Sequence, residues 1–189
     1  MGRLVVSEFI TLDGVFEDPG GAEGKPYGGW QTPLMGEDES AFKLSELKQA
    51  DALLLGRVTY EGFAAAWPTM QDTGEFGELM NNLPKYVATL TAADFTWQNS
   101  QALAPNTHAA VTQLKQQYAG DILVMGSGQL VSSLLENDLV DELRLMTYPI
   151  LLGQGRHLFD SMPRKKLRYV STQAFAGGAI LVSYSQQAS

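Results

Sequence analysis

Cysteine is absent from this chain of 189 residues, which excludes disulfide bonds, thiolate metal sites and cysteine nucleophiles. Histidine occurs only as His108 and His157, and this pair does not have metal-ligand spacing. Basic residues are also few, since 13 lysines and arginines against 21 acidic residues give a net charge of -8. We therefore do not expect nucleic-acid binding, because neutralising phosphates needs a concentrated basic surface.

Long hydrophobic runs are missing as well. No apolar run approaches the ~20 residues of a membrane span. The first residues, Met1-Gly2-Arg3-Leu4, lead directly into strand-like sequence without the hydrophobic region of a signal peptide. No internal repeat, low-complexity tract or interdomain linker divides the chain. We expect one cytoplasmic domain, residues 1–189, that binds neither a membrane nor a metal ion.

Short apolar runs alternate with helical patterns through residue 135. Glycine ends several of the runs, and Ser40, Thr107 and Ser127 are candidate helix caps. This order predicts an α/β fold with a largely parallel sheet and helices on both faces. The predicted strands are 3–10, 51–56, 85–90 and 121–126, and the predicted helices are 40–50, 57–67, 107–118 and 127–135.

The remaining segments follow other patterns. Residues 142–150, 167–175 and 179–185 read as strands, and Ala176-Gly177-Gly178 between the last two suits a hairpin. The sheet is therefore predicted to be mixed, mostly parallel, with an antiparallel hairpin at the C-terminus. Residues 13–39 form a long, acidic, glycine-rich loop, which is typical of a functional or a solvated segment. Residues 71–84 are predicted to be a loop with a helical turn near 76–83.

Two glycine-containing turns carry the chemistry that the residues themselves predict. Gly56-Arg57-Val58-Thr59-Tyr60 and Gly126-Ser127-Gly128-Gln129-Leu130 each leave a buried strand and enter a helix. Backbone N–H groups at a helix N-terminus favour an anion, and the Arg57 guanidinium suits a phosphate. Two such sites on neighbouring strands would suit a dinucleotide. The alternative is that both glycines only make tight turns and that Ser127 is only a cap.

Common signatures do not explain these turns. Val131 follows Gly126-Ser127-Gly128 where a dinucleotide fingerprint needs its third glycine. Gly24-Lys25 is followed by Pro26 and lacks the first glycine of a phosphate-binding loop. No Gly-x-Ser-x-Gly elbow is present. The class of ligand is left open by these patterns alone.

Several segments together resemble a known family. Residues 54–61, Leu-Leu-Gly-Arg-Val-Thr-Tyr-Glu, resemble the Gly-Arg-x-Thr-[Tyr/Trp]-Glu segment of dihydrofolate reductases. Residues 7–14 are similar to the opening strand and Ser-Leu-Asp-Gly turn of the RibD C-terminal domain, the reductase domain of bacterial riboflavin biosynthesis. Residues 124–128 and 141–159 resemble further segments of that fold. The resemblance spans residues 3–185 in the family's order.

The resemblance implies a dihydrofolate reductase-like fold, NADPH as the hydride donor and a homodimer. It places Arg57 near the 2′-phosphate of the cofactor. The residues that it assigns to the cofactor are Gly56, Arg57, Thr59, Leu90 and Thr91 at the adenosine end, Gly126, Ser127, Gly128, Gln129 and Leu130 at the pyrophosphate, and Phe9 and Ile10 at the nicotinamide.

The catalytic residues are less clearly indicated. A folate reductase uses an acid on its first helix, and the corresponding segment here is the glycine-rich acidic loop. Asp13, at the end of the first strand, is the first candidate for a proton donor, followed by Glu37, Asp38 and Glu39. Asp13 also fits a turn-forming residue beside Gly14. Trp30 and Phe42 are candidates for stacking on a planar substrate, or for anchoring the core and the loop.

The resulting hypothesis is an NADPH-dependent reductase that transfers hydride to a planar heterocycle. The acceptor would be 5-amino-6-(5-phosphoribosylamino)uracil, as in riboflavin biosynthesis, or a pterin-like relative. The departures from the family are the absence of a second basic cluster for a ribose phosphate and of the zinc deaminase often fused to it. The alternatives are a non-catalytic NADP(H)-binding module or sensor, and a protein of another class that binds a different phosphorylated ligand.

Overall fold

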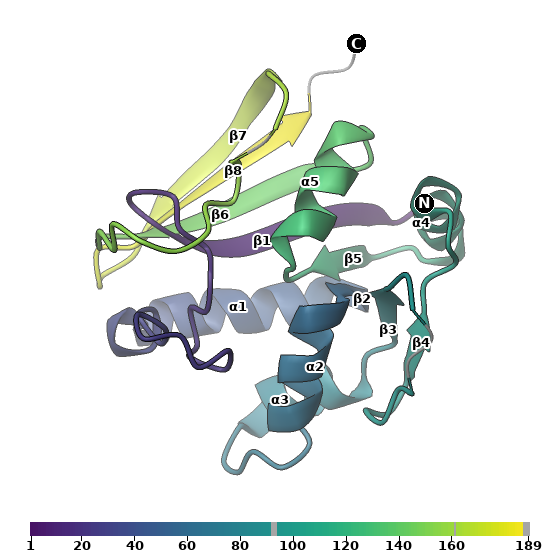
Figure 1. Ribbon diagram of the computed structural model, residues 1–189, viewed down its shortest axis with the longest axis horizontal. Helices are drawn as coiled ribbons and strands as arrows, with labels where there is room; N and C mark the ends of the chain where they lie inside the picture. The colour runs from purple at the N-terminus through teal and green to yellow at the C-terminus, as the bar shows by residue number, and fades with distance from the viewer. Residues whose placement is uncertain (92–93, 161, 187–189) are drawn as a thin grey trace.

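Eight strands form one mixed sheet in the computed structural model, in the order β4-β3-β2-β5-β1-β6-β8-β7 (Figure 1). The structure describes residues 1–91, 94–160 and 162–186. The pairs from β4 to β6 are parallel, whereas β8 runs antiparallel to both β6 and β7. The predicted change from parallel to antiparallel is confirmed. The strands are β1 (Arg3–Thr11), β2 (Ala50–Gly56), β3 (Lys85–Ala88), β4 (Ser100–Ala102), β5 (Asp121–Val124), β6 (Glu142–Tyr148), β7 (Leu167–Ala174) and β8 (Ile180–Gln186).

Helices cover both faces of the sheet, as the alternation of elements predicts. Side chains alternate across a strand, so Leu53 and Leu55 of β2 pack with α1, α2 and α3, while Leu54 packs with α4 and α5. Figure 1 shows α5 in front of the sheet and α1 behind it. The helices are α1 (Glu37–Gln49), α2 (Arg57–Ala66), α3 (Gly74–Asn82), α4 (Thr107–Gln117) and α5 (Gly128–Glu136), with a short 3-10 helix, η1 (Thr32–Leu34).

Some boundaries differ from the sequence-based predictions. The helical turn predicted near 76–83 is a longer helix, α3, over residues 74–82, in which the fully buried Met80 packs against the sheet face. The strand β4 carries no alternation of apolar residues and was not predicted. Ser40 is not a cap, since α1 begins at Glu37. The cap of α4 is Asn106 rather than Thr107, because the Asn106 side chain accepts the Ala109 N–H at 3.0 Å.

Residues 12–36, hereafter the flap, form the irregular part of the predicted long loop. The flap lies beside residues 149–160, and the two segments are joined where the Phe16 N–H donates to the Arg156 carbonyl at 3.2 Å (Figure 1). The carboxylate of Glu17 is buried and accepts hydrogen bonds from the Tyr27 hydroxyl and the Arg156 Nε, both at 2.7 Å. Burial would raise the Glu17 pKa, but these bonds outweigh it and lower the pKa to about 2. The flap is therefore held by an internal charged cluster.

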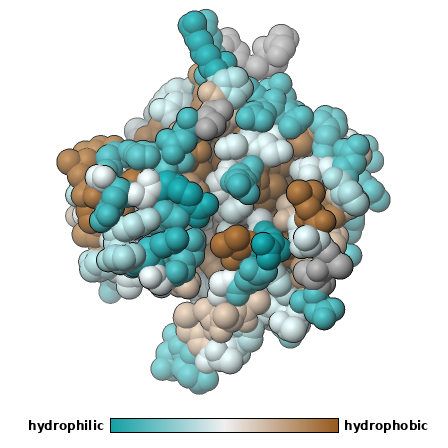
Figure 2. Space-filling view, viewed as in Figure 1, coloured by the Kyte–Doolittle hydropathy of each residue, from teal (hydrophilic) through white to brown (hydrophobic). Residues whose placement is uncertain are grey.

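The surface of the molecule mixes polar and apolar residues. In Figure 2 an apolar group lies at the left edge, on the side where the flap, residues 149–160 and the β7–β8 turn lie in Figure 1. Exposed apolar side chains on this side include Leu12 and Leu151, together with Ile180 at the start of β8. No helix in the described part of the chain is long and apolar enough to span a bilayer.

Candidate active site

The two glycine turns lie side by side at the carboxyl edge of the sheet. The strands β2 and β5 are parallel neighbours in which Leu54 pairs with Val124, so the turns that follow them end at the same edge. The Gly56 N–H donates to the Gly126 carbonyl at 3.1 Å. The structure therefore brings together the two turns that the sequence singles out, at the edge where open α/β sheets bind ligands.

Neither turn has room for a side chain at its first glycine. A Cβ atom at Gly56 would lie 2.9 Å from the Ser127 nitrogen. At Gly126 the backbone has a φ of +85°, and a Cβ atom would lie 2.6 Å from Thr59 Oγ1. Thr59 belongs to the first turn of α2, so residues of both motifs interlock. The glycines are required by this close approach of two backbones.

The turns also present unpaired donors. The first N–H groups of α5, from Gly128, Gln129 and Leu130, have no acceptor within the helix. Ser127 occupies the N-cap position, but its side chain makes no capping hydrogen bond. The Ser127 hydroxyl therefore does not accept a backbone N–H of α5. Ser127 is thus the N-cap residue of α5, as predicted, although its side chain makes no capping bond, and a role toward a ligand stays a prediction.

Arg57 lies at the start of α2, with half of its side chain exposed. Its Nη1 donates to Glu61 Oε1 at 2.9 Å, one helical turn further on. Arg57 is thus free to exchange this exposed partner for a phosphate. Leu90 and Thr91 lie beyond β3, because that strand ends at Ala88, and Leu90 is fully exposed. The predicted strand end at residue 90 is wrong, and a contact of these two residues with adenosine stays a prediction.

An aromatic cluster lies on the α1 side of β1, near the same edge. The Tyr148 ring lies 5.7 Å from the Phe9 ring and 5.9 Å from the Trp30 ring, both edge to face. Trp30 is buried, and its indole N–H donates to the Glu17 carbonyl at 2.9 Å, so it anchors the flap. Phe42 packs against Phe175 with ring centroids 5.9 Å apart. The anchoring role left open for Trp30 and Phe42 is therefore observed, and substrate stacking stays a prediction.

Phe9 and Ile10 leave β1 on opposite faces. The Phe9 ring lies 5.1 Å from the Lys43 ammonium of α1, whereas Ile10 packs among the residues beneath α5. This follows from the alternation of side chains along a strand. The two side chains therefore lie on opposite sides of the sheet, and a contact of both residues with the nicotinamide stays a prediction.

Asp13 has a structural environment that does not suit a proton donor. Its carboxylate accepts hydrogen bonds from Thr11 Oγ1 at 2.5 Å, from the Gly153 N–H at 2.7 Å and from the Leu152 N–H at 3.1 Å. These bonds, led by that from Thr11, hold the Asp13 pKa below its usual value. A general acid needs a raised pKa. We therefore do not retain Asp13 as the acid; it ties the end of β1 to Leu152 and Gly153.

Replacement of Asp13 by asparagine should destabilise the protein. The amide keeps one acceptor oxygen and turns two donors toward backbone N–H groups, which should cost about 1–3 kcal/mol. The free energy of unfolding in urea measures this, with the exposed Asp160→Asn as the matched control. Unchanged stability combined with a loss of turnover would restore Asp13 as a catalytic residue.

Among the acidic residues at the start of α1, Glu39 differs from its neighbours. Glu37 and Asp38 are exposed, while Glu39 is completely buried. Glu39 Oε2 accepts the Gly36 N–H at 3.0 Å, and Oε1 is buried without a hydrogen-bond partner in the described part of the chain. Burial first, and then the adjacent Asp38, raise the Glu39 pKa. Glu39 is also close enough to Tyr148 for its charge to raise the tyrosine pKa, which burial raises first, to about 12.

Glu8 of β1 is a second buried carboxyl, and sequence reasoning missed it. Its Oε1 accepts the Gly126 N–H at 2.6 Å, which joins the centre of the sheet to the second glycine turn. Burial raises the Glu8 pKa to about 7, although the Gly126 hydrogen bond and the Lys43 charge oppose this shift. The alternation along β1 could have revealed it, because Glu8 falls on the same face as Val6 and Ile10.

A buried ion network lies on the opposite face of β1. Lys43 Nζ donates to Ser7 Oγ at 2.8 Å and to Glu46 Oε2 at 2.5 Å. Arg144 Nη1 donates to Glu46 Oε1 at 3.0 Å. Burial would raise the Glu46 pKa, but the Lys43 and Arg144 charges lower it below its usual value. The spacing of Lys43 and Glu46 alone gave no reason to expect these residues to be buried.

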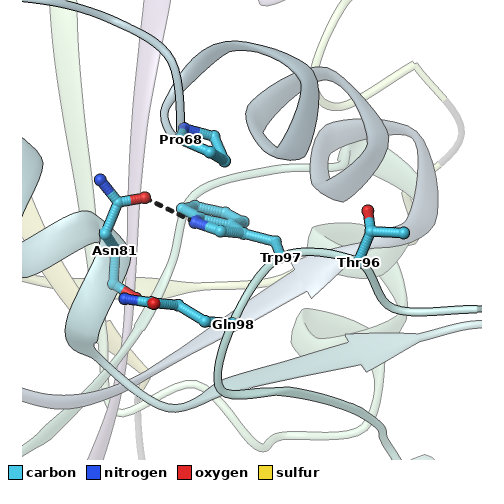
Figure 3. Close-up of a pocket in the computed structure, with 5 residues that line it drawn as sticks. All are labelled: Pro68, Asn81, Thr96, Trp97 and Gln98. Carbon is cyan, nitrogen blue, oxygen red and sulfur yellow. Dashed lines mark hydrogen bonds between the residues drawn. The ribbon is translucent and has the colours of Figure 1, made fainter.

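A separate pocket of about 340 Å³ lies away from the glycine turns (Figure 3). Pro68 and Asn81 lie near the C-terminal ends of α2 and α3, and Trp97 precedes β4, so the pocket is at the amino edge of the sheet. Trp97 Nε1 donates to Asn81 Oδ1 at 2.7 Å. In residues 1–91, 94–160 and 162–186 no group of acidic or histidine side chains is arranged to hold a metal ion.

The eight-stranded mixed sheet, flanked by helices and antiparallel at its C-terminal strands, is a dihydrofolate reductase-like fold. The chain is similar in structure to the dihydrofolate reductase of Enterococcus faecalis complexed with NADP(H), with a TM-score of 0.65. That similarity covers 98% of this chain and 97% of the reductase, at 16% sequence identity.

The chain belongs to the RibD C-terminal domain family, whose sequence profile matches residues 3–181. It is similar to a putative riboflavin biosynthesis protein from Shewanella sp. PV-4, with a TM-score of 0.77 and 18% identity over 98% of this chain and 99% of that one. It is also 29% identical to the uncharacterised protein YyaP of Bacillus subtilis (strain 168) in an alignment 188 positions long that covers 96% of this chain and 94% of YyaP. The family resemblance expected from the sequence is confirmed.

Proposed function

We propose that this protein is an NADPH-dependent oxidoreductase that transfers hydride to a planar heterocycle. The acceptor class is 5-amino-6-(5-phosphoribosylamino)uracil, as in riboflavin biosynthesis, or a pterin-like relative. The observation that carries the proposal is the pair of interlocked glycine turns at one sheet edge, where the Gly56 N–H donates to the Gly126 carbonyl at 3.1 Å. Two helices begin beside these turns, so both supply unpaired N–H groups.

The residues at this edge fit a dinucleotide phosphate. The N–H groups at the start of α5 and the Ser127 hydroxyl would hold the pyrophosphate. Arg57, at the start of α2, would pair with the 2′-phosphate in place of Glu61. NADPH, when bound, supplies the hydride. The missing side chain at Gly126 makes room for Thr59, which keeps this turn close to the start of α2.

The flap covers the second turn. A Cβ atom at Gly128 would lie 2.9 Å from Phe16 Cε1, and the Arg156 guanidinium lies 5.5 Å from the centre of the same ring. A ligand at the turn would therefore meet Phe16 directly. In this proposal the flap shields the bound cofactor and acceptor from water.

Glu39 is the residue that we propose as the proton donor to the acceptor. Its Oε1 is buried and lacks a hydrogen-bond partner in the described residues, and its pKa is raised by burial. A carboxylic acid with a raised pKa retains its proton to higher pH and can donate it to a nitrogen of the heterocycle. The aromatic side chains of Phe9, Trp30 and Phe42 lie on the same side of the sheet and would contact the planar ring.

Two further points belong to the proposal. The burial of Trp30 and the structural bonds of Asp13 favour, as the second candidate, a non-catalytic NADP(H)-binding module that uses the same turns.

A homodimer is supported by the edge strand β7, where Tyr169 is 59% and Val170 45% exposed. Apolar side chains on an unpaired sheet edge favour contact with a second chain.

Replacement of Arg57 by alanine tests the cofactor assignment. We expect NADPH affinity to fall about tenfold, because one exposed charge-assisted hydrogen bond is lost, and NADH affinity to change less than about twofold. Titration calorimetry with both cofactors measures the ratio, with the exposed Arg164→Ala as a control for net charge. An equal loss for NADPH and NADH would contradict the 2′-phosphate assignment.

A further inference from the structure

Glu8 holds the second glycine turn from inside the sheet. It lies in β1 between the neighbouring strands β5 and β6, and it is buried. Its Oε1 accepts the Gly126 N–H at 2.6 Å. This bond turns the Gly126 N–H inward, so the donors left for a ligand are those at the start of α5. A titratable carboxyl thus lies one hydrogen bond below the turn that we propose to bind pyrophosphate.

A nearby anion can change the protonation state of Glu8, because the cations around Glu8 are already paired with other carboxylates. On the α1 side the Lys43 ammonium is already bonded to Ser7 and to Glu46, which also pairs with Arg144. Lys43 therefore acts on Glu8 by charge rather than by a direct bond. On the flap side Arg156 pairs with Glu17 at 2.7 Å and with Glu23 at 3.5 Å.

A pyrophosphate bound above Gly126 would add negative charge next to this carboxyl. Like charges disfavour the ionised form, and low exposure to water strengthens the effect. The neutral acid keeps its second oxygen to accept the Gly126 N–H, so the turn stays in place when Glu8 is protonated. Protonation therefore removes the repulsion without releasing the turn.

We propose that Glu8 is a proton-coupled positioning residue: it orients the Gly126–Leu130 turn and takes up a proton from the solvent when a dinucleotide binds there. This inference rests on the proposed cofactor site. The burial that raises the Glu8 pKa to about 7 sets the range in which the uptake is observable. Because the bound anion raises this pKa further, binding becomes weaker as the pH rises above 7.

The test is calorimetric titration of the wild-type protein with NADH and NADPH, in buffers of different ionisation enthalpy. Comparison of these buffers gives the number of protons taken up, and NADH avoids titration of the 2′-phosphate, whose second pKa is about 6. For a shift of about one pKa unit we expect uptake of about half a proton per dinucleotide near pH 7.5. The dissociation constant should then rise by about fivefold between pH 7 and 9.

Glu8→Gln should remove both effects. The glutamine carbonyl can accept the Gly126 N–H, so we expect binding that changes less than about twofold over the same pH range. Glu136→Gln, at the exposed C-terminal end of α5, removes one charge from the same helix and should keep the wild-type profile. Circular dichroism confirms that each variant is folded.

These measurements distinguish a failure of the proposed Glu8 role from a failure of the proposed cofactor site. Dinucleotide binding by the wild type with an uptake below about one tenth of a proton would overturn the role of Glu8 and leave the cofactor site standing. An unchanged pH profile in folded Glu8→Gln would do the same. Failure of the wild type to bind either dinucleotide would overturn both. If Glu8→Gln does not fold, the proton uptake of the wild-type protein on dinucleotide binding still tests the role of Glu8.

Discussion

Replacement of Glu39 by glutamine should lower kcat by about 10²–10⁴-fold with 5-amino-6-(5-phosphoribosylamino)uracil as the acceptor, the range typical of a lost general acid. Glutamine still accepts the Gly36 N–H, so the start of α1 should stay intact. NADPH affinity should change less than about twofold, because Glu39 lies with the aromatic cluster rather than at the glycine turns. Steady-state kinetics and cofactor titration measure the two effects separately.

The matched control for this variant is Glu37→Gln, which removes an exposed carboxylate from the same turn of α1. It should retain wild-type kcat. Wild-type kcat should also fall as the pH rises through the raised pKa of Glu39, since the acid must be protonated to act. A kcat of Glu39→Gln that equals the wild-type value would mean that the proton comes from another group.

Replacement of Gly56 by alanine should weaken NADPH binding about 10- to 100-fold. The new Cβ atom would lie 2.9 Å from the Ser127 nitrogen, so one of the two turns must shift. Overpacking of this kind costs about 1–3 kcal/mol, and each 1.4 kcal/mol is tenfold in affinity. Thermal unfolding and cofactor titration of the same sample show how much of the cost falls on stability.

Gly20→Ala is the control for Gly56→Ala. Gly20 lies in the flap, and a Cβ atom there meets no heavy atom within 4 Å. It should therefore bind NADPH as the wild type does. Wild-type affinity in folded Gly56→Ala would show that the contact between the two turns does not shape the cofactor site.

The features that sequence patterns predict are those that depend on neighbouring residues. Glycine after an apolar run marks both turns, and Gly177-Gly178 marks the C-terminal hairpin that the structure confirms. A parallel sheet places both turns at one edge, but only the observed pairing of β2 with β5 brings Gly56 to Gly126. The shared edge of the two turns could therefore be predicted from local signals and the order of elements, whereas their contact could not.

The carboxyls were harder to predict, because burial is a property of the folded chain. Asp13 follows a strand end, as a catalytic acid would, yet backbone donors from residues 152 and 153 lower its pKa. Glu39 sits beside two exposed acids, and only the packing of α1 against the β7–β8 turn separates it from them. Glu8 reads as one polar residue in a strand until its contact with Gly126 is known.

Two short elements were predicted only in part or not at all, for a related reason. The helix α3 contains few apolar residues and two glycines, and it forms because Met80 is drawn into the core. The strand β4 has three residues and is defined by pairing with β3 rather than by its own composition. In both cases tertiary contacts outweigh local preference.

The most direct test of the account is titration of the wild-type protein with NADPH and with NADH, followed by quenching of tryptophan fluorescence. We predict saturable binding of NADPH at about micromolar concentrations, with NADH about tenfold weaker because it lacks the phosphate partner of Arg57. Absence of binding for both dinucleotides would contradict the cofactor site, and with it the proposed function.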